Sequence, residues 1–398
     1  MIKFSDRLNN MEESATLAMS RLSRELKQQG KDVISLSLGE PDFATPSFIE
    51  DAAIEGMKEG YTKYPPVPGY DDLRQAICDK FQRDNNLHYE INQVVVSTGA
   101  KQSIANVVLS IINPGDEVLV PAPYWVSYIE IVKLAGGIPI SIPSSIENDY
   151  KVTGKQVEEK ISNKTKLFIF STPCNPTGSL YSKEELKELA NVFAKYKDIV
   201  IISDEIYEHI NFSGKHESIA QFPEVYNQTV VVNGLSKAWA MTGWRLGYIG
   251  APKEIAAACT KMQGQFTSGA NSIAQRAAIA ALRKETSYLK EMISAFKNRR
   301  DIVYKGLLEI KGLHVNLPKA AFYFFPDISD LFGKTTPKGQ VIQTSNDLST
   351  YILDEVLVAL VPGEAFGNPN SIRISYATDE ATLTEALRRI KIAIEKLK

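Results

Sequence analysis

The sequence of 398 residues contains few cysteines, and those it has are widely separated. The three are Cys78, Cys174 and Cys259, and no CxxC pair is present. This spacing argues against a disulfide framework and against a zinc site, so we expect no metal centre. Unpaired cysteines also favour a reducing compartment over an oxidising one.

The sequence also lacks an excess of charge of either sign and any long hydrophobic run. Its formal net charge is -2, so nothing indicates a nucleic acid or an acidic membrane surface as a partner. No apolar run approaches the roughly 18 residues of a membrane helix. The first residues, MIKFSDRLNNMEES, contain no apolar core of a signal peptide. We therefore expect a cytoplasmic protein.

A dinucleotide-binding fingerprint is absent as well. None of the expected strands is followed by GxGxxG, which argues against a nicotinamide-dependent dehydrogenase. The composition, with 44% hydrophobic and 23% charged residues, is that of an ordinary globular protein large enough for two or three domains.

Apolar strands and amphipathic helices alternate between residues 92 and 250. Strands are expected at residues 94–97, 117–120, 138–142, 166–172, 199–203, 229–233 and 244–250, with helices between most of them. This alternation is typical of an α/β protein with a mostly parallel sheet. The run KLFIFST at 166–172 is almost continuously apolar, as in a sheet that helices cover on both faces.

The flanking segments have a different pattern. Helices are expected at residues 12–30, 287–310 and 381–398, and short strands at 33–38, 321–326, 358–361 and 372–375. We interpret residues 286–398 as a smaller α+β domain to which the N-terminal segment 1–45 contributes. The large domain then consists of residues 46–285.

Loops with chemically useful residues follow several of the expected strands. These loops carry Gly99, Asn175, Asp204 and Lys237, and doubly wound sheets bind their ligands at the carboxyl ends of the strands. Lys237 stands among apolar neighbours, where desolvation favours the neutral amine that can form a Schiff base with a carbonyl group. Each loop alone could be an ordinary turn, but several at one sheet edge favour a ligand site.

Further residues could contribute to the same site. A helix N-terminus after Gly99 attracts anions, and the guanidinium of Arg245 suits a phosphate. Trp125 could stack on a flat ring, Arg373 could hold a carboxylate, and a proline-rich loop could fix Tyr64. Each also has an ordinary alternative as a turn charge, a core aromatic residue, a solvated arginine or loop packing. Together, the groups match the needs of an aldehyde cofactor with a phosphate and a pyridine nitrogen.

Several segments carry a resemblance to a known family. They are SLGEPDF (37–43), VSTGAKQS (96–103), PGDEV (114–118), PYWVSY (123–128), NPTG (175–178), SDEIYEH (203–209), SKAWAMTGWRLGY (236–248) and RISYAT (373–378). Over essentially its whole length the chain resembles the class I aminotransferases of fold type I, the aspartate aminotransferase family that uses pyridoxal 5'-phosphate. More narrowly, it is similar to the bacterial and plastid branch active on aspartate, some of whose members also use prephenate.

The resemblance implies a large domain with a mostly parallel seven-stranded sheet between helices, a smaller α+β domain, and defined roles around the cofactor ring. Lys237 would form the Schiff base and then move the proton at the substrate α-carbon. Asp204 would pair with the pyridine nitrogen, Tyr207 and Asn175 would hydrogen-bond the ring oxygen, and Trp125 would stack on the ring.

The resemblance also implies a phosphate site shared between two subunits. The phosphate is expected to be held by the backbone at Gly99, Ala100 and Lys101, together with Ser236 and Arg245. Tyr64 is expected to reach the phosphate of the neighbouring subunit, so that a homodimer would carry its active sites at the interface.

The implied substrate is a dicarboxylic amino acid. Arg373 would grip the α-carboxylate, with Gly39, Asn175 and Trp125 nearby, and the Lys101 side chain would contact the distal carboxylate. An alternative for Lys101 is a charge that faces the phosphate. The expected reaction moves the amino group of L-aspartate to 2-oxoglutarate, in a ping-pong sequence that gives oxaloacetate and L-glutamate.

The cofactor residues alone leave other activities open. An aminotransferase for aromatic, neutral or prephenate-type substrates, or a lyase of the same fold, would share all of them, so Lys101 is the discriminating residue. Glu12 and Pro65 stand where close relatives often carry lysine and threonine, and these departures argue against the use of prephenate. A cofactor-bound regulatory domain would need a basic DNA-binding segment, which we do not expect here.

Overall fold

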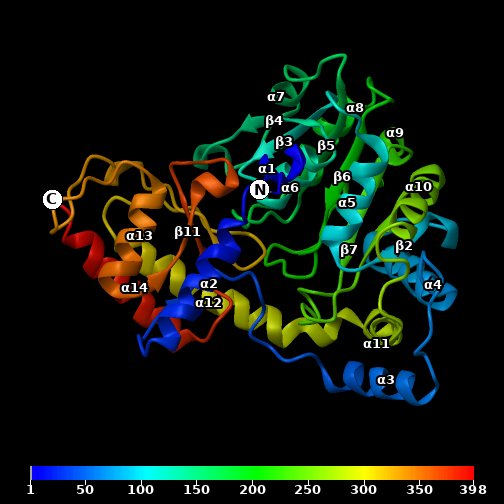
Figure 1. The fold of residues 1–398 in the computed structure, drawn as a ribbon, viewed down its shortest axis with the longest axis horizontal. Coiled ribbons are helices and arrows are strands. Elements are labelled where there is room, and N and C mark those ends of the chain that lie inside the picture. Colours follow the sequence, from blue (N-terminus) through cyan, green and yellow to red (C-terminus); the bar gives the residue numbers. More distant parts are fainter. Residues whose placement is uncertain (1) are drawn as a thin grey trace.

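A seven-stranded sheet forms the centre of the larger part of the molecule (Figure 1). The computed structural model describes residues 2–398. The strands are β2 (Val94–Ser97), β3 (Glu117–Ala122), β4 (Ile138–Pro143), β5 (Thr165–Ser171), β6 (Val200–Asp204), β7 (Thr229–Gly234) and β8 (Gly247–Gly250). Their order is β2-β8-β7-β6-β5-β3-β4, and only β8 runs against its neighbours. The predicted mostly parallel sheet is therefore confirmed.

Helices cover the sheet on both faces, because successive residues of its strands point to opposite sides. Leu167 and Ile169 of β5 pack into a cluster with α5 (Ala100–Ile111), α6 (Ser127–Leu134) and α10 (Lys253–Gly264). Phe168 and Phe170 of the same strand pack on the other face, against α7 (Gly154–Glu158) and α8 (Lys183–Phe193). Burial on both faces explains why the strand is apolar almost throughout.

Four further helices complete the sheet-bearing part. Helices α3 (Ser47–Lys58) and α4 (Asp71–Lys80) precede the sheet strands, α9 (Pro223–Tyr226) lies between β6 and β7, and α11 (Ser272–Arg283) follows β8. Helices α3 and α11 lie side by side at one end of the molecule in Figure 1 and are in contact.

A second part of the molecule is built from both ends of the chain (Figure 1). Its helices are α2 (Ala15–Gln28), α12 (Lys290–Leu308), α13 (Ser345–Val356) and α14 (Glu380–Glu395), whereas the short α1 (Asp6–Asn9) lies against α6 of the sheet-bearing part. Strands β11 (Val361–Pro362), β12 (Ile372–Ser375) and β9 (Tyr323–Phe324) form one sheet, and β1 (Ile34–Ser35) pairs with β10 (Val358–Ala359) in another. The pairing of β1 with β10 joins the N-terminal segment to the C-terminal elements.

Some predicted element bounds were too long. The strand expected at 244–250 begins only at Gly247, because Arg245 has φ of 55°, which no strand residue adopts. Helix α6 begins at Ser127, two residues after Trp125. In the second part, the strands expected at 33–38 and 321–326 shorten to two residues each.

No helix among residues 2–398 is long and apolar enough to cross a membrane.

Candidate active site

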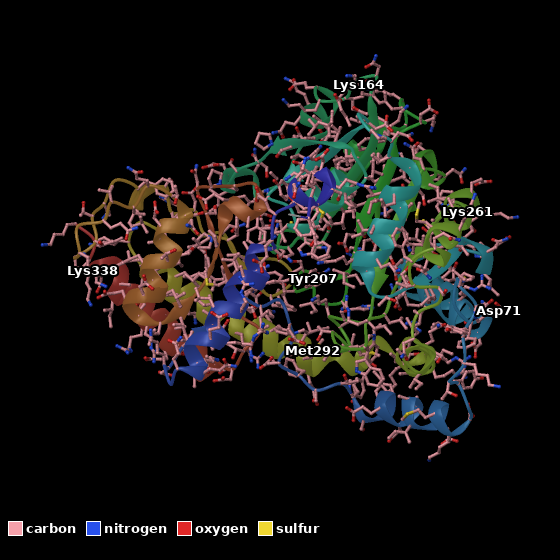
Figure 2. The ribbon with its side chains drawn as sticks, viewed as in Figure 1. Asp71, Lys164, Tyr207, Lys261, Met292 and Lys338 are labelled. Carbon is pink, nitrogen blue, oxygen red and sulfur yellow. The ribbon has the colours of Figure 1, made fainter. Side chains whose placement is uncertain are left out.

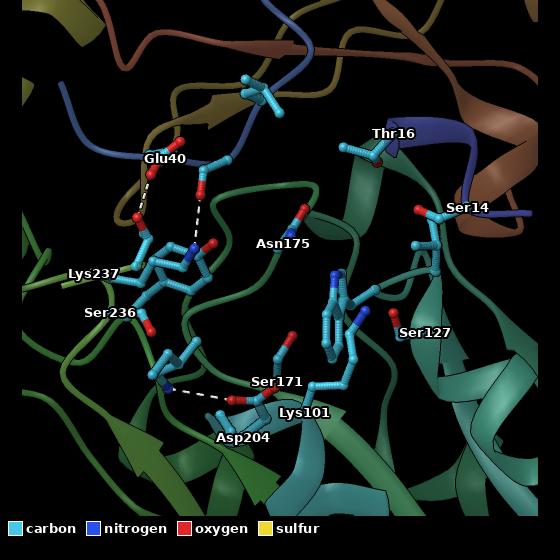
Figure 3. A pocket seen from close by; sticks show the side chains of 18 of the residues that line it. Ser14, Thr16, Glu40, Lys101, Ser127, Ser171, Asn175, Asp204, Ser236 and Lys237 are labelled. Carbon is cyan, nitrogen blue, oxygen red and sulfur yellow. Dashed lines mark hydrogen bonds between the residues drawn. The ribbon is translucent and has the colours of Figure 1, made fainter. Parts of the chain in front are cut away.

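A cavity of about 420 Å³ opens beyond the carboxyl ends of the central strands (Figure 3). Residues of both parts of the molecule line it, and Figure 2 places Tyr207, one of them, between the two parts. Most of the predicted site residues line this cavity: Gly39, Ala100, Lys101, Trp125, Asn175, Asp204, Tyr207, Ser236, Lys237, Arg245 and Arg373. The fold thus brings together residues that are far apart in the sequence.

Lys237 lies just past the end of β7, where its amine points into the cavity (Figure 3). The amine donates a hydrogen bond of 2.7 Å to the carbonyl oxygen of Gly39. Burial lowers the pKa of Lys237 to about 8, although the carboxylate of Glu40 opposes this; the cations of Arg245 and Arg373 lower it further. A pKa near 8 leaves part of the lysine as the neutral, nucleophilic amine near neutral pH.

Asp204 is the last residue of β6 and forms the floor of the cavity. Its Oδ2 accepts a hydrogen bond of 2.7 Å from the Tyr128 hydroxyl, and its Oδ1 accepts one of 3.3 Å from the backbone of Ile206. Burial raises the pKa of Asp204 to about 6, and both hydrogen bonds oppose the shift. Asp204 is therefore a buried carboxylate that can pair with a protonated ring nitrogen.

An anion-binding corner lies where α5 begins. Gly99 precedes the helix with φ of 82°, and a Cβ atom there would lie 2.5 Å from Nη2 of Arg245. Glycine therefore allows the guanidinium to rest against the first turn of α5, and Nη1 of Arg245 donates to the carbonyl oxygen of Thr242 at 2.9 Å. The first N–H groups of a helix have no acceptor within the helix, and the helix dipole adds positive potential there. With the Ser236 hydroxyl in the same cavity, this donor set fits a phosphate.

Arg373 of β12 is buried, with 2% of its surface exposed. Its Nη1 donates to Oδ1 of Asn175 at 3.0 Å and its Nη2 to the carbonyl oxygen of Ser37 at 2.5 Å. The Nε atom is buried without a partner among the described residues. Because these acceptors are neutral, the guanidinium keeps its charge uncompensated, and burial lowers its pKa. A bound carboxylate would supply the missing negative charge.

Lys101 in the first turn of α5 and Trp125 before α6 lie next to each other on the cavity wall. The Lys101 ammonium lies 5.1 Å from the centre of the Trp125 ring. Burial and then the charge of Arg245 lower the pKa of Lys101. The cavity wall thus carries a second cation besides the buried guanidinium of Arg373.

Two of the predicted cofactor residues do not line the cavity. Gly99 lies directly behind the lining residue Arg245. Tyr64 lies in the loop between α3 and α4, with 97% of its surface exposed. Its predicted contact requires a second copy of the chain.

Two tyrosines that were not predicted from the sequence belong to the site. Tyr128 donates to Asp204, and Tyr323 hydrogen-bonds to Tyr207 through its hydroxyl at 2.7 Å. Both line the cavity and both are buried. A weak signal existed for Tyr128, because it stands three residues after Trp125 at a helix start. No local signal separates Tyr323 from the neighbouring aromatic residues of AFYFFP.

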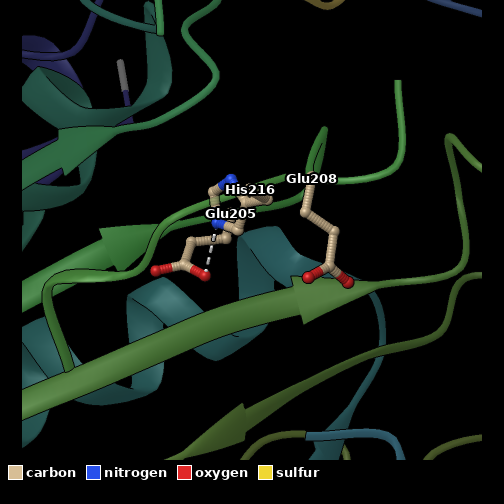
Figure 4. A group of neighbouring side chains, drawn as sticks. All are labelled: Glu205, Glu208 and His216. Atoms are coloured by element: carbon tan, nitrogen blue, oxygen red, sulfur yellow. Dashed lines mark hydrogen bonds and ion pairs between the residues drawn. The ribbon is translucent and has the colours of Figure 1, made fainter. Parts of the chain in front are cut away.

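A second buried polar cluster stands behind the cavity and does not line it (Figure 4). In this cluster Glu205 Oε2 contacts His216 Nε2 at 2.8 Å. Glu208 pairs with Lys80 and accepts a hydrogen bond of 2.8 Å from the amide of Asn85. Burial alone would raise the pKa of Glu208, but Lys80 holds it well below its usual range. The cluster is an ion-pair network that anchors the segment after β6.

Comparison with known proteins agrees with this geometry. The family model described as aminotransferase class I and II matches residues 31–390. The chain therefore belongs to the class I and II aminotransferase family, and the predicted enzyme class is confirmed.

Several individual members of this family are similar to the chain over nearly its whole length. Over 401 residues, the chain is 46% identical to the bifunctional aspartate aminotransferase and glutamate/aspartate-prephenate aminotransferase of Petunia hybrida. This match covers 100% of this chain and 84% of the relative. The aspartate aminotransferase of Rhizobium meliloti matches with a TM-score of 0.97 and 40% identity over 100% of both chains. The aspartate aminotransferase of Thermus thermophilus with maleate matches with a TM-score of 0.92 and 37% identity, over 99% of this chain and 100% of that one. These likenesses confirm the predicted fold type I.

Proposed function

We propose that this protein is an aspartate aminotransferase that uses pyridoxal 5'-phosphate and transfers the amino group of L-aspartate to 2-oxoglutarate. The observation that carries the proposal is that the Lys237 amine, the Asp204 carboxylate and the Arg373 guanidinium line one cavity. When bound, the cofactor supplies an aldehyde for a Schiff base and a ring that accepts electrons.

The residues present fit this cofactor. The corner at Gly99 and Arg245 offers donors to a phosphate. Asp204 offers a buried carboxylate to a pyridine nitrogen, and its raised pKa of about 6 still leaves it mostly ionised at neutral pH. The Ser171 hydroxyl, also in the cavity wall, is buried without a partner among the described residues, which suits a polar ligand.

Lys237 is the group that we assign to proton transfer. Its amine is held at 2.7 Å from the Gly39 carbonyl oxygen, so it starts from a fixed place in the cavity. Its lowered pKa makes it both a nucleophile toward an aldehyde and a base of useful strength near neutral pH. Once a substrate amine has displaced it, the free Lys237 amine would take the proton from the substrate α-carbon and return it at another atom.

The remaining residues position the ligands. Tyr207 would donate to the ring oxygen, and Trp125 would cover one face of the ring. Arg373 would bind the α-carboxylate with two hydrogen bonds, which fixes the α-carbon relative to Lys237. Asn175 already accepts a hydrogen bond from Arg373 and so holds the guanidinium group in place.

Lys101 supports the assignment of a dicarboxylic substrate. Its ammonium lies over the Trp125 ring, in the wall of the cavity that Arg373 also lines. A second carboxylate would gain a charge-assisted contact there, whereas an apolar side chain would leave the lysine without an anion. The relatives whose names include aspartate support the same substrate class.

We further propose a homodimer, in which Tyr64 of one copy completes the phosphate site of the other. Its exposure of 97% suits a residue that a second chain covers. The division into residues 1–45, 46–285 and 286–398 remains part of the proposal, as does a cytoplasmic location, which the buried, unpaired cysteines favour.

The test is a single half-reaction. The purified protein is loaded with pyridoxal phosphate, one amino acid is added, and the visible absorbance of the cofactor is followed; Lys237→Ala serves as the control. We expect rapid conversion with aspartate and glutamate and slow conversion with alanine and phenylalanine. Faster reaction with aromatic or neutral donors would overturn the substrate assignment, and no reaction with any donor would overturn the enzyme assignment. Prephenate, offered afterwards as the amino acceptor, tests the activity that the Petunia relative's name includes.

A further inference from the structure

Tyr323 lies where the two parts of the molecule meet, and none of the roles assigned so far uses it. It belongs to β9 and is fully buried. Its hydroxyl lies 2.7 Å from the hydroxyl of Tyr207, which follows β6 of the large sheet. The contact joins residues 116 positions apart, one from each part of the molecule.

Tyr323 also supports the arginine that we assign to the substrate. The Arg373 guanidinium lies over its ring, 4.7 Å from the centre. Tyr323 and Arg373 stand on paired strands, because β9 and β12 are hydrogen-bonded with Tyr323 opposite Ser375. Any movement of this small sheet would therefore carry both residues together.

The Tyr323 hydroxyl fills the space in front of Gly39. A Cβ atom at Gly39 would collide with this hydroxyl, so glycine is needed there for the tyrosine to reach Tyr207. The carbonyl oxygen of Gly39 accepts from Lys237 at 2.7 Å. Tyr323 thus touches or adjoins residues on the cofactor side and on the substrate side of the cavity.

We infer that Tyr323 is a positioning residue that couples the hydroxyl of Tyr207 to the carboxylate-binding Arg373. The inference rests on the proposed function, in which the Tyr207 hydroxyl donates a hydrogen bond to the cofactor's ring oxygen. A hydroxyl has one proton to donate. With the Tyr207 proton directed to the cofactor, Tyr323 must be the donor within the tyrosine pair.

This order of donation has a consequence for the cofactor. A hydroxyl that accepts a hydrogen bond becomes a better donor, because hydrogen bonds in a chain polarise one another. Tyr323 would therefore strengthen the bond from Tyr207 to the ring oxygen and hold the Tyr207 ring in one orientation. Its own ring, by stacking with the guanidinium, would hold Arg373 ready for the substrate.

The experiment separates these two contributions. Tyr323→Phe removes the hydroxyl and keeps the ring, whereas Tyr323→Leu removes both. The matched control is Tyr351→Phe, which also removes a buried hydroxyl bond, here of 2.9 Å to the Ala393 carbonyl oxygen, away from the cavity. For each variant we would measure the dissociation constant of pyridoxal phosphate from the purified protein and that of maleate, a non-reacting dicarboxylate, from the loaded protein.

We expect Tyr323→Phe to weaken cofactor binding by about 3- to 10-fold, the range that one neutral hydrogen bond is worth, with maleate binding changed less than about 2-fold. Tyr323→Leu should in addition weaken maleate binding by about 10-fold, because the Arg373 cation loses one of its two aromatic partners and keeps only Phe366. Tyr351→Phe should leave both constants within about 2-fold of the wild type.

The coupling itself is tested by a double-mutant cycle. In the Tyr207→Phe background, Tyr323→Phe should cost no further cofactor affinity, since its acceptor is gone. Equal losses in both backgrounds, or losses no larger than those of Tyr351→Phe, would overturn the inference. Failure of the proposed function would look different: the wild type would bind cofactor and not react with aspartate, while the binding cycle would still report on the tyrosine pair.

Discussion

The most informative single substitution is Lys101→Ala, because it tests the substrate class without touching the cofactor chemistry. The Lys101 ammonium lies at the cavity wall, 5.1 Å from the Trp125 ring centre. Removing one partner of a close charge pair typically costs roughly 2–5 kcal/mol when the pair is desolvated. Because solvent still reaches the Lys101 side chain, its contact with a ligand is only partly desolvated, and the lower end applies.

A loss of about 2 kcal/mol corresponds to roughly 30-fold in kcat/KM, at about 1.36 kcal/mol per tenfold. We therefore expect Lys101→Ala to lower kcat/KM for aspartate by about 30-fold. The value for alanine, which has no distal carboxylate, should change by less than about threefold. The measurement is the half-reaction with each donor under single-turnover conditions. Lys261→Ala, on the exposed surface of α10 (Figure 2), is the matched control and should leave both donors unaffected.

Two results would refute this reasoning in different ways. Equal losses for aspartate and alanine, together with weaker cofactor binding, would place the lysine at the phosphate. No loss for either donor would mean that the ammonium contacts neither ligand, and the preference for dicarboxylates would need another residue.

Three further predictions follow from the other buried groups. Lys237→Ala should lower turnover by at least about 10²–10⁴-fold, the range of general acid–base assistance; turnover within tenfold of the wild type would refute its role. Tyr128→Phe should raise the pKa of Asp204 above its value of about 6, because the carboxylate loses a donor, so the acidic limb of the kcat/KM profile should move to higher pH; an unchanged limb would contradict this. Lys80→Met should destabilise the protein by about 3–5 kcal/mol in urea unfolding at pH 7, because Glu208 stays buried without its cation. The pKa of Glu208 is depressed in the folded state, so the stabilisation by the pair is present above the unfolded pKa of about 4.3 and is lost as the pH falls below it. The difference in unfolding free energy between the wild type and Lys80→Met should therefore shrink toward pH 4. A difference that does not depend on pH would argue against the ion pair.

The strands of the large sheet could be predicted because strands buried on both faces are apolar at nearly every position. A run such as residues 166–172 is apolar throughout, and the helices between such runs leave little choice but a parallel arrangement. Strand ends in the second part were predicted less well. The strands there are two to four residues long, so the apolar runs that mark them also include the loops that pack beside them.

By itself, the sequence determined the large sheet, the loops at its carboxyl edge and the residues that those loops carry. Asp204 ends a strand, and Lys237 follows the next one, so their meeting at one edge depends only on local order. Only the tertiary structure decided what these residues touch. The contact of Asn175 with Arg373 spans 198 positions and that of Tyr207 with Tyr323 spans 116. Such contacts depend on how the two parts of the molecule pack against each other, and the local pattern of neither segment contains that information.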